Sequence, residues 1–130
     1  MKYTAITENH LFRKAYVKGK KFCGRLVAVY VLPDYAAEKL KNARPDKKYV
    51  NRIGISTSKK IGGAVIRSRA RRIIREGYRE VERELRLRRG RLIVIAARSA
   101  VAGAKAPDIA KELRSAFIAT GMVMPEKSSD

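Results

Sequence analysis

The chain has 130 residues, a length that suits one compact domain with a modest hydrophobic core and argues against a second domain. Its 31 Lys and Arg residues outnumber 12 Asp and Glu residues, and the net charge of +19 would repel itself unless a polyanion supplied the opposite charge. Composition therefore favours nucleic acid as the partner over a membrane, because no segment is apolar enough to span a bilayer and none has the apolar face of an interfacial helix.

The single cysteine and the N-terminal segment both indicate a cytoplasmic protein. Cys23 has no intramolecular partner for a disulfide and cannot build a thiol metal cluster. We interpret it as a small buried or half-buried side chain rather than a reactive thiol. The first ten residues, MKYTAITENH, lack the apolar run of a signal peptide.

The first half of the chain predicts one helix and two strands. The helix begins after Thr7, a suitable N-cap, and ends at Gly19. Its apolar residues recur at helical spacing, at Leu11, Phe12, Ala15 and Tyr16. A basic turn or short strand over 20–25 leads into a strand over 26–32, which ends at Pro33. Residues 34–48 are predicted to form an irregular surface segment. From residue 49 to 57, side chains that alternate with a period of two predict the next strand.

The second half predicts a long helix, a buried strand and a final helix. The helix runs from 64 to about 88, with one apolar face formed by Ile66, Ala70, Ile73, Gly77, Val81 and Leu85. Residues 92–97 are a continuous apolar strand, and a helix follows from Pro107 to its cap at Gly121. We expect a single domain over 1–124 with a disordered tail over 125–130, and an α+β two-layer fold of order α-β-β-β-α-β-α.

A run of cationic residues marks the start of the long helix. It consists of Lys59, Lys60, Arg67, Arg69, Arg71, Arg72 and Arg75, with no acidic residue among them. A helix N-terminus is already positive, and like charges at i, i+4 cost about 0.2–0.5 kcal/mol per pair. Phosphate groups would make the same arrangement favourable, because guanidinium groups and helix-end N–H groups converge on oxyanions. The alternative is that these residues form a solvated basic face without a ligand. Acidic residues occur only from Glu76 onward, and this separation of basic from acidic residues along the helix favours phosphate binding.

Three aromatic residues lie in basic surroundings and suit RNA stacking. Phe12 and Tyr16 are one helical turn apart, and Tyr30 lies in the first strand. Stacking of bases on such rings contributes about 1–3 kcal/mol per base. Core packing is the alternative, which the residues alone favour for Phe12, while Tyr16 and Tyr30 suit either role.

The sequence carries no recognisable enzyme motif. His10 is the only histidine, and the motifs HExxH, CxxC, GxxxxGK[ST] and GxSxG do not occur. The acids are scattered or paired with Arg along a helix, so a catalytic dyad or a carboxylate metal cluster has no obvious source. We therefore assign no catalytic residue and no metal ligand.

The segment GISTSKKIGGAVIRSRARRIIREGY, residues 54–78, resembles the signature of the bacterial ribonuclease P protein family. That pattern runs Ser-x-Ser-Lys-Lys-x-Gly-Asn-Ala-Val-x-Arg-Asn-Arg-x-Lys-Arg. The order of elements is similar from about Ile6 to Met122. The chain differs from the pattern at Gly63 and Ser68, where the family usually has Asn, and at Ala5, where an Arg is frequent.

The resemblance implies a site for each of two RNAs. It places contacts with the catalytic RNA at Ser56, Lys59, Lys60, Arg67, Ser68, Arg69, Arg71, Arg72 and Arg75. It places the single-stranded 5′ leader of precursor tRNA in a cleft at Phe12, Tyr16 and Tyr30. It also implies a mixed sheet of about four strands with three helices and a left-handed β-α-β crossover.

The function implied is that of the protein subunit of ribonuclease P, an endoribonuclease whose catalytic centre lies in its RNA. The implied partners are ribonuclease P RNA and precursor tRNA, with no protein partner, and the implied cofactor is Mg²⁺ bound mainly by RNA. A ribosomal or chaperone-like RNA-binding protein without a role in tRNA processing is the alternative. A reader of the DNA major groove is less well supported, since no helix-turn-helix partner is evident.

Overall fold

The computed structural model describes residues 4–5, 9–33 and 51–124. The elements in chain order are β1 (Thr4–Ala5), α1 (Asn9–Lys18), β2 (Lys20–Cys23), β3 (Val27–Pro33), β4 (Arg52–Ser56), the 3-10 turn η1 (Lys59–Ile61), α3 (Ala64–Glu84), β5 (Arg91–Ala97), the 3-10 turn η2 (Ser99–Gly103) and α4 (Ala106–Ala119). The predicted order α-β-β-β-α-β-α is confirmed by α1, β2, β3, β4, α3, β5 and α4. The predictions for 34–48 and for the tail lie outside the described residues.

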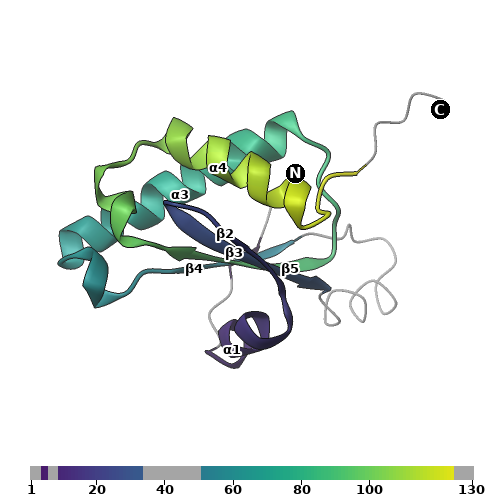
Figure 1. Cartoon of the computed structure of the whole chain (residues 1–130), viewed down its shortest axis with the longest axis horizontal. Coiled ribbons are helices and arrows are strands. Elements are labelled where there is room, and N and C mark those ends of the chain that lie inside the picture. The colour runs from purple at the N-terminus through teal and green to yellow at the C-terminus, as the bar shows by residue number, and fades with distance from the viewer. Residues whose placement is uncertain (1–3, 6–8, 34–50, 125–130) are drawn as a thin grey trace.

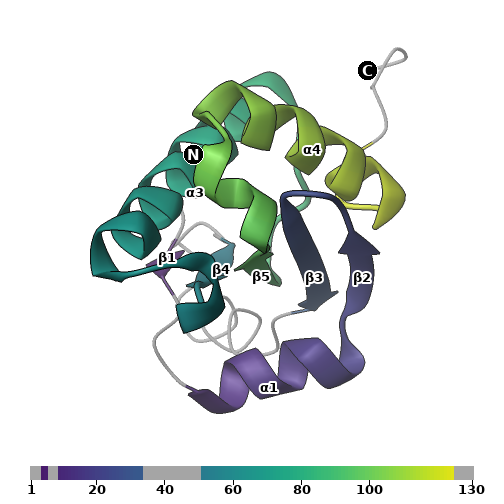
Figure 2. The same cartoon turned by 60° about the vertical axis from the view of Figure 1, so that its left-hand side comes forward.

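The strands form one mixed sheet, which Figure 1 shows nearly edge-on, and their order β1-β4-β5-β3-β2 can be followed in Figure 2. β4 pairs with β5 in parallel, while β3 pairs with both β5 and β2 in antiparallel register. The predicted four-stranded mixed sheet corresponds to β2 through β5. The two-residue strand β1, parallel to β4 at the sheet edge, was not predicted, because two residues are too few to show a period.

Side chains alternate between the two faces of this sheet. Val27, Val29 and Val31 of β3 lie in the core that α3 and α4 cover, together with Ile93 and Ile95 of β5. The intervening residues Leu32, Leu92 and Val94 form a smaller core with Leu11 and Ala15 of α1. Figure 2 accordingly shows the sheet between α1 on one side and the α3 and α4 layer on the other. No helix within the described ranges is long and apolar enough to cross a membrane.

Helices α3 and α4 approach closely at Gly77. A Cβ atom at this position would lie 2.8 Å from Cγ2 of Ile109, so only glycine fits without a shift. At the next residue of α3, the ring of Tyr78 meets that of Phe117 of α4 edge to face, with centroids 6.0 Å apart. Tight packing at these contacts fixes the direction of α3 relative to α4.

The predicted apolar face of α3 is confirmed at Ala70, Ile73, Gly77 and Val81, which are all buried. It was wrong at Ile66 in the first turn, which is 42% exposed because its side chain lies beside Gly62 and not in the core. The predicted end near residue 88 was also wrong. The helix ends at Glu84, because Leu85 is extended and the following Leu87 is buried in a β-bridge with Val123. Tertiary packing has here overridden the helical period.

Core packing by α4 can be tested with Leu113→Ala. This change should lower the free energy of unfolding by about 2–5 kcal/mol, because it leaves a cavity under a fully buried side chain. Ile118→Ala on the same helix is the control, since Ile118 is 64% exposed, and its effect should stay within about 0.5 kcal/mol. Urea unfolding followed by circular dichroism measures both, and equal losses would contradict the burial of Leu113.

Candidate RNA-binding surface

The start of α3 is a positive helix end that no acidic side chain compensates. Its N-cap is Gly63, which makes no side-chain capping hydrogen bond, and no acidic residue occupies the first turn. Lys59 and Lys60 of η1 are exposed just before it. The unpaired N–H groups of the first turn and the partial positive charge at this end therefore remain available to an anion.

Along α3 the predicted contact residues divide into two groups by exposure. Ser68, Arg72 and Arg75 are exposed at i, i+4 and i+7, so they form one outward-facing stripe. Arg67, Arg69 and Arg71 are half-buried. The stripe is the part of the helix that a large RNA can reach without displacing protein contacts.

The half-buried arginines are largely committed to the protein itself. Arg69 donates from Nη1 to the carbonyl of Ala102 at 3.2 Å and from Nη2 to that of Ala104 at 2.7 Å. Arg71 donates from Nη1 to Oγ1 of Thr57 at 2.7 Å. Arg67 differs, because its Nε is buried without a hydrogen-bond partner in the described parts of the chain. Arg69 and Arg71 thus fix the beginning of α3 to η2 and to the end of β4.

Two tyrosines form an aromatic surface between α1 and the sheet. The rings of Tyr16 and Tyr30 meet edge to face, with centroids 4.9 Å apart, and Tyr16 is 41% exposed. Nζ of Lys21, which pairs with Tyr30 across β2 and β3, lies 5.7 Å from the Tyr30 ring centroid. Phe12 is half-buried against the small core under α1. The structure thus brings Tyr16 and Tyr30 together in a basic setting.

The strand register connects this aromatic surface to the start of α3. Ser56 pairs with Ala96 of β5, and Val94, two residues earlier, pairs with Tyr30. Ser56 and Tyr30 therefore lie on the same face of the sheet. Ser56 is half-buried and ends β4 just before Lys59 and Lys60. The two predicted sets of contact residues thus lie around one face and one end of the sheet, although RNA contact by each residue stays a prediction.

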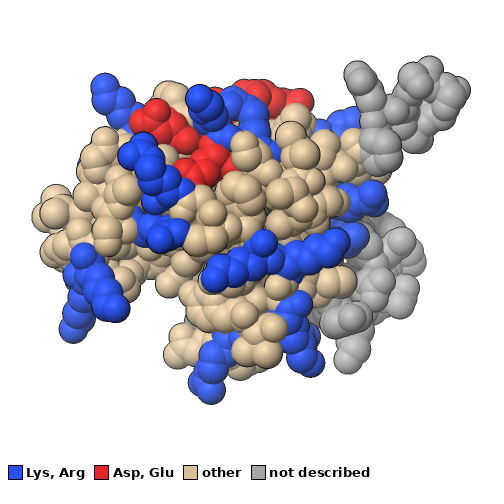
Figure 3. All heavy atoms as spheres, in the orientation of Figure 1, with Lys and Arg blue, Asp and Glu red and all other residues tan. Residues whose placement is uncertain are grey.

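Acidic residues of the described ranges are confined to the helical layer, from Glu76 to the end of α3 and on α4. Arg114 donates to Glu80 at 2.8 Å and to Glu84 at 2.7 Å, and its hydrogen bond holds the pKa of Glu84 below the usual range. Glu112 accepts the backbone N–H of Leu26 at 2.9 Å. In Figure 3 the acidic side chains accordingly gather over α3 and α4, whereas only basic ones are visible around α1.

Some features of the surface were not predicted from the sequence. Lys21 was not singled out, because its position over Tyr30 depends on the strand register. The expectation that Cys23 is buried or half-buried was wrong: its side chain is exposed at the β2 edge, with Sγ 2.6 Å from Nη1 of Arg98. His10 is exposed on α1. No group of three or more His, Cys, Asp or Glu residues in the described ranges could hold a metal ion.

Comparison with known proteins assigns the chain to a family. The family model for ribonuclease P matches residues 1–120. A ribonuclease P protein component from Clostridium acetobutylicum is 38% identical over 129 residues, covering 99% of this chain and 98% of the relative. The ribonuclease P protein structure from Staphylococcus aureus has a TM-score of 0.71 at 24% identity, covering 95% of this chain and all of the other. That from Thermotoga maritima has a TM-score of 0.60 at 18% identity, covering 80% of this chain and 86% of the other. The chain therefore belongs to the ribonuclease P protein family.

Proposed function

We propose that this chain binds ribonuclease P RNA and the 5′ leader of precursor tRNA, and so promotes the endonucleolytic maturation of tRNA 5′ ends. The observation that supports this most directly is the sheet face with the Tyr16 and Tyr30 pair, which carries no acid among the described residues and adjoins the start of α3. Phosphodiester hydrolysis is the task of the RNA subunit in this proposal. No residue of the chain is assigned a catalytic role.

The two parts of the surface suit different RNA chemistry. The exposed stripe of Ser68, Arg72 and Arg75, with Lys59 and Lys60, presents charge without a ring and fits the phosphate backbone of the folded catalytic RNA. The Tyr16 and Tyr30 rings beside Lys21 fit unpaired bases of a leader, which stack on aromatic faces while the backbone follows positive charge. One small protein can thereby hold substrate and ribozyme together.

The proposal assigns Mg²⁺ to the RNA. The predicted contact residues are cationic, aromatic or hydroxylic, and cationic groups repel a divalent cation. Their contribution is to neutralise RNA phosphates, which reduces repulsion between substrate and ribozyme and lets Mg²⁺ act at lower concentration. The cytoplasm, where precursor tRNA is made in bacteria, is the proposed location.

Reconstitution with ribonuclease P RNA from the same genome tests the division of labour. The protein alone should not cleave precursor tRNA, whereas its addition should lower the Mg²⁺ concentration that the RNA needs for half-maximal cleavage. Cleavage by rigorously RNA-free protein would contradict the assignment of catalysis to RNA. RNA binding without any gain in processing would instead support a ribosomal or chaperone-like role.

The two groups of arginines can be separated by substitution. Arg69→Ala should lower the free energy of unfolding by about 1–2 kcal/mol, because two carbonyl groups lose a charged donor. Arg72→Ala should change it by less than about 0.5 kcal/mol, since Arg72 is exposed, yet should weaken binding of the catalytic RNA. Thermal unfolding and filter binding measure the two effects. If Arg69→Ala left stability unchanged, its anchoring role would be wrong.

The aromatic surface is tested by varying leader length. Tyr16→Ala should weaken holoenzyme binding of precursor tRNA with a long leader about tenfold, because a stacked base contributes about 1–3 kcal/mol. Binding of a leaderless tRNA by the same variant should not change, so this second substrate serves as the control within each variant. Phe22→Ala is a matched aromatic control, since Phe22 packs against the α3 and α4 core on the other face of the sheet. Equal losses with both substrates would exclude leader stacking on Tyr16.

A further inference from the structure

A second arginine-rich segment, which the candidate RNA-binding surface does not include, connects α3 to β5. Residues 85–91 read LRLRRGR and contain Arg86, Arg88, Arg89 and Arg91 without an acidic residue. Gly90 adopts a φ of 73°, in the left-handed region that favours glycine, and turns the chain into β5. The segment therefore gathers four cations within one short connection.

This connection is fixed to the C-terminal end of α4. The N–H of Arg88 donates to the carbonyl of Met122 at 2.7 Å, and the N–H of Met124 donates to the carbonyl of Arg86 at 2.7 Å. Leu87 is buried between these bonds, and Nε of Arg88 donates to the carbonyl of Gly121 at 3.0 Å. The guanidinium groups are thus held on an ordered backbone, which lowers the entropy cost of binding an anion.

A hollow on one side of the connection is lined by cations from separate parts of the chain. Its volume is about 480 Å³, and its charged lining residues are Lys18 at the end of α1, Lys20 at the start of β2, Arg88 and Arg91. The other lining residues are Val31, Leu32, Pro33, Thr120 and Gly121. Among the described residues, the lining therefore contains no acidic side chain and no aromatic ring.

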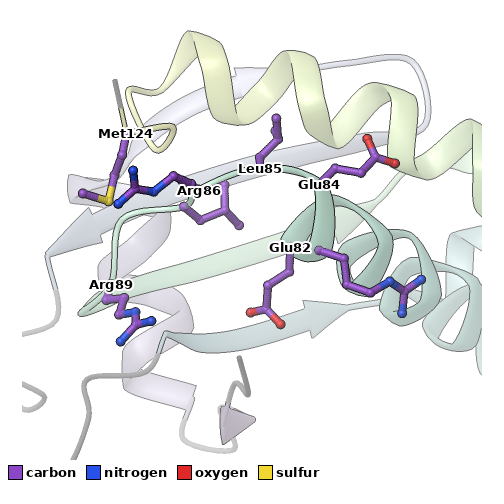
Figure 4. A pocket seen from close by; sticks show the side chains of 8 residues that line it. Glu82, Glu84, Leu85, Arg86, Arg89 and Met124 are labelled. Atoms are coloured by element: carbon purple, nitrogen blue, oxygen red, sulfur yellow. The ribbon is translucent and has the colours of Figure 1, made fainter. Parts of the chain in front are cut away.

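The hollow on the other side of the connection differs in charge. Its volume is about 540 Å³, and Figure 4 shows Glu82 and Glu84 around it together with Arg86 and Arg89. The lining of this hollow thus mixes acidic and basic side chains, although the carboxylate of Glu84 accepts from Arg114 of α4. Among the described lining residues, the first hollow differs because its charged side chains are all cationic.

Helix ends account for only part of this cationic hollow. Helices α1 and α4 both end beside it, and a cation near a helix C-terminus gains about 0.3–1 kcal/mol from the helix dipole. Arg88 benefits from the dipole of α4, because its Nε donates to the carbonyl of Gly121 just after that helix. The side chains of Lys18 and Lys20, however, form no hydrogen bond or ion pair with any described residue, and both residues are exposed. Their mutual repulsion stabilises nothing in the isolated protein.

The cationic hollow lies apart from the candidate RNA-binding surface. Lys20 pairs with Val31 and Arg91 with Pro33, positions that alternate with Tyr30 and Leu32, so both belong to the sheet face that α3 and α4 cover. Arg91 also begins β5, whereas the start of α3 lies beyond the other end of that strand. The hollow therefore lies at the opposite end of the sheet from the start of α3, where Lys18 and Leu32 of the α1 side meet Lys20 and Arg91 of the other face.

We propose that the hollow formed by Lys18, Lys20, Arg88 and Arg91 is a second phosphate-binding site, which takes the backbone of a folded RNA. Four clustered cations favour a polyanion, and the described lining residues include no aromatic ring on which an unpaired base could stack. Backbone phosphates of a helical RNA fit this chemistry. The inference rests on the proposed function and assigns the occupant to the folded ribonuclease P RNA rather than to the leader.

The test compares two double variants of equal charge. Lys18→Gln with Lys20→Gln removes two cations of the hollow that bind no other described group, so the fold should be retained. Binding of ribonuclease P RNA should weaken about tenfold, and the slope of log affinity against log salt should fall by about 1.5 to 2. Arg86→Gln with Arg89→Gln is the matched control in the neighbouring hollow, and should weaken binding less than about twofold.

The outcomes separate this inference from the proposed function. An unchanged affinity of the Lys18 and Lys20 variant, or an equal loss in the control, would overturn the second site. A loss confined to leader-bearing precursor tRNA would overturn its assignment to folded RNA. Failure of the wild-type chain to bind ribonuclease P RNA would instead overturn the proposed function. In that case the affinity for a plain RNA duplex, titrated in parallel, still tests the hollow. If the hollow binds backbone phosphates, the Lys18 and Lys20 variant should bind the duplex more weakly than the Arg86 and Arg89 variant.

Discussion

The parallel pairing of β4 with β5 is the constraint on which the rest of this structure depends. Because these neighbouring strands run in the same direction, α3 must carry the chain back along the sheet between them. The start of α3 is thereby placed beyond the ends of β4 and β5, where Arg71 reaches Thr57 and Arg69 reaches the carbonyls of η2. An arginine-rich helix end that would be unfavourable in isolation is thus fixed in one place by the fold.

The same pairing explains where the acidic residues can lie. The later turns of α3 pack against α4, and there Arg114 binds Glu80 and Glu84. The carboxylate of Glu112 is likewise used within the protein, by the backbone N–H groups that begin β3. These contacts keep negative charge within the helical layer. The face with Tyr16 and Tyr30 is left without a described acid, so a polyanion meets little repulsion there.

The sequence predicted those features that follow from local period and charge. The order of elements, the buried face of α3 around Ile73 and the cap at Gly121 all follow from spacing. Features that depend on contacts distant in sequence were not predictable. Arg69 and Arg72 are both arginines of the same basic run, but only Arg69 donates to the carbonyls of Ala102 and Ala104. The helix ends before Leu87, which pairs with Val123, far away in the sequence. The exposure of Cys23 likewise depends on β2 being an edge strand.

Two basic regions on one small domain allow recognition by shape. The cationic hollow and the start of α3 lie at opposite ends of β5. Its seven residues span about 20 Å at 3.3 Å per residue. A central strand bonded on both sides cannot stretch, so phosphates bound at its two ends would be held at a fixed separation. An unfolded RNA must lose entropy to satisfy that separation, whereas a folded RNA with the right spacing already has it. With phosphates bound at both regions as proposed, the rigid sheet would therefore distinguish RNAs of equal charge by the spacing of their phosphates, without contacting a base.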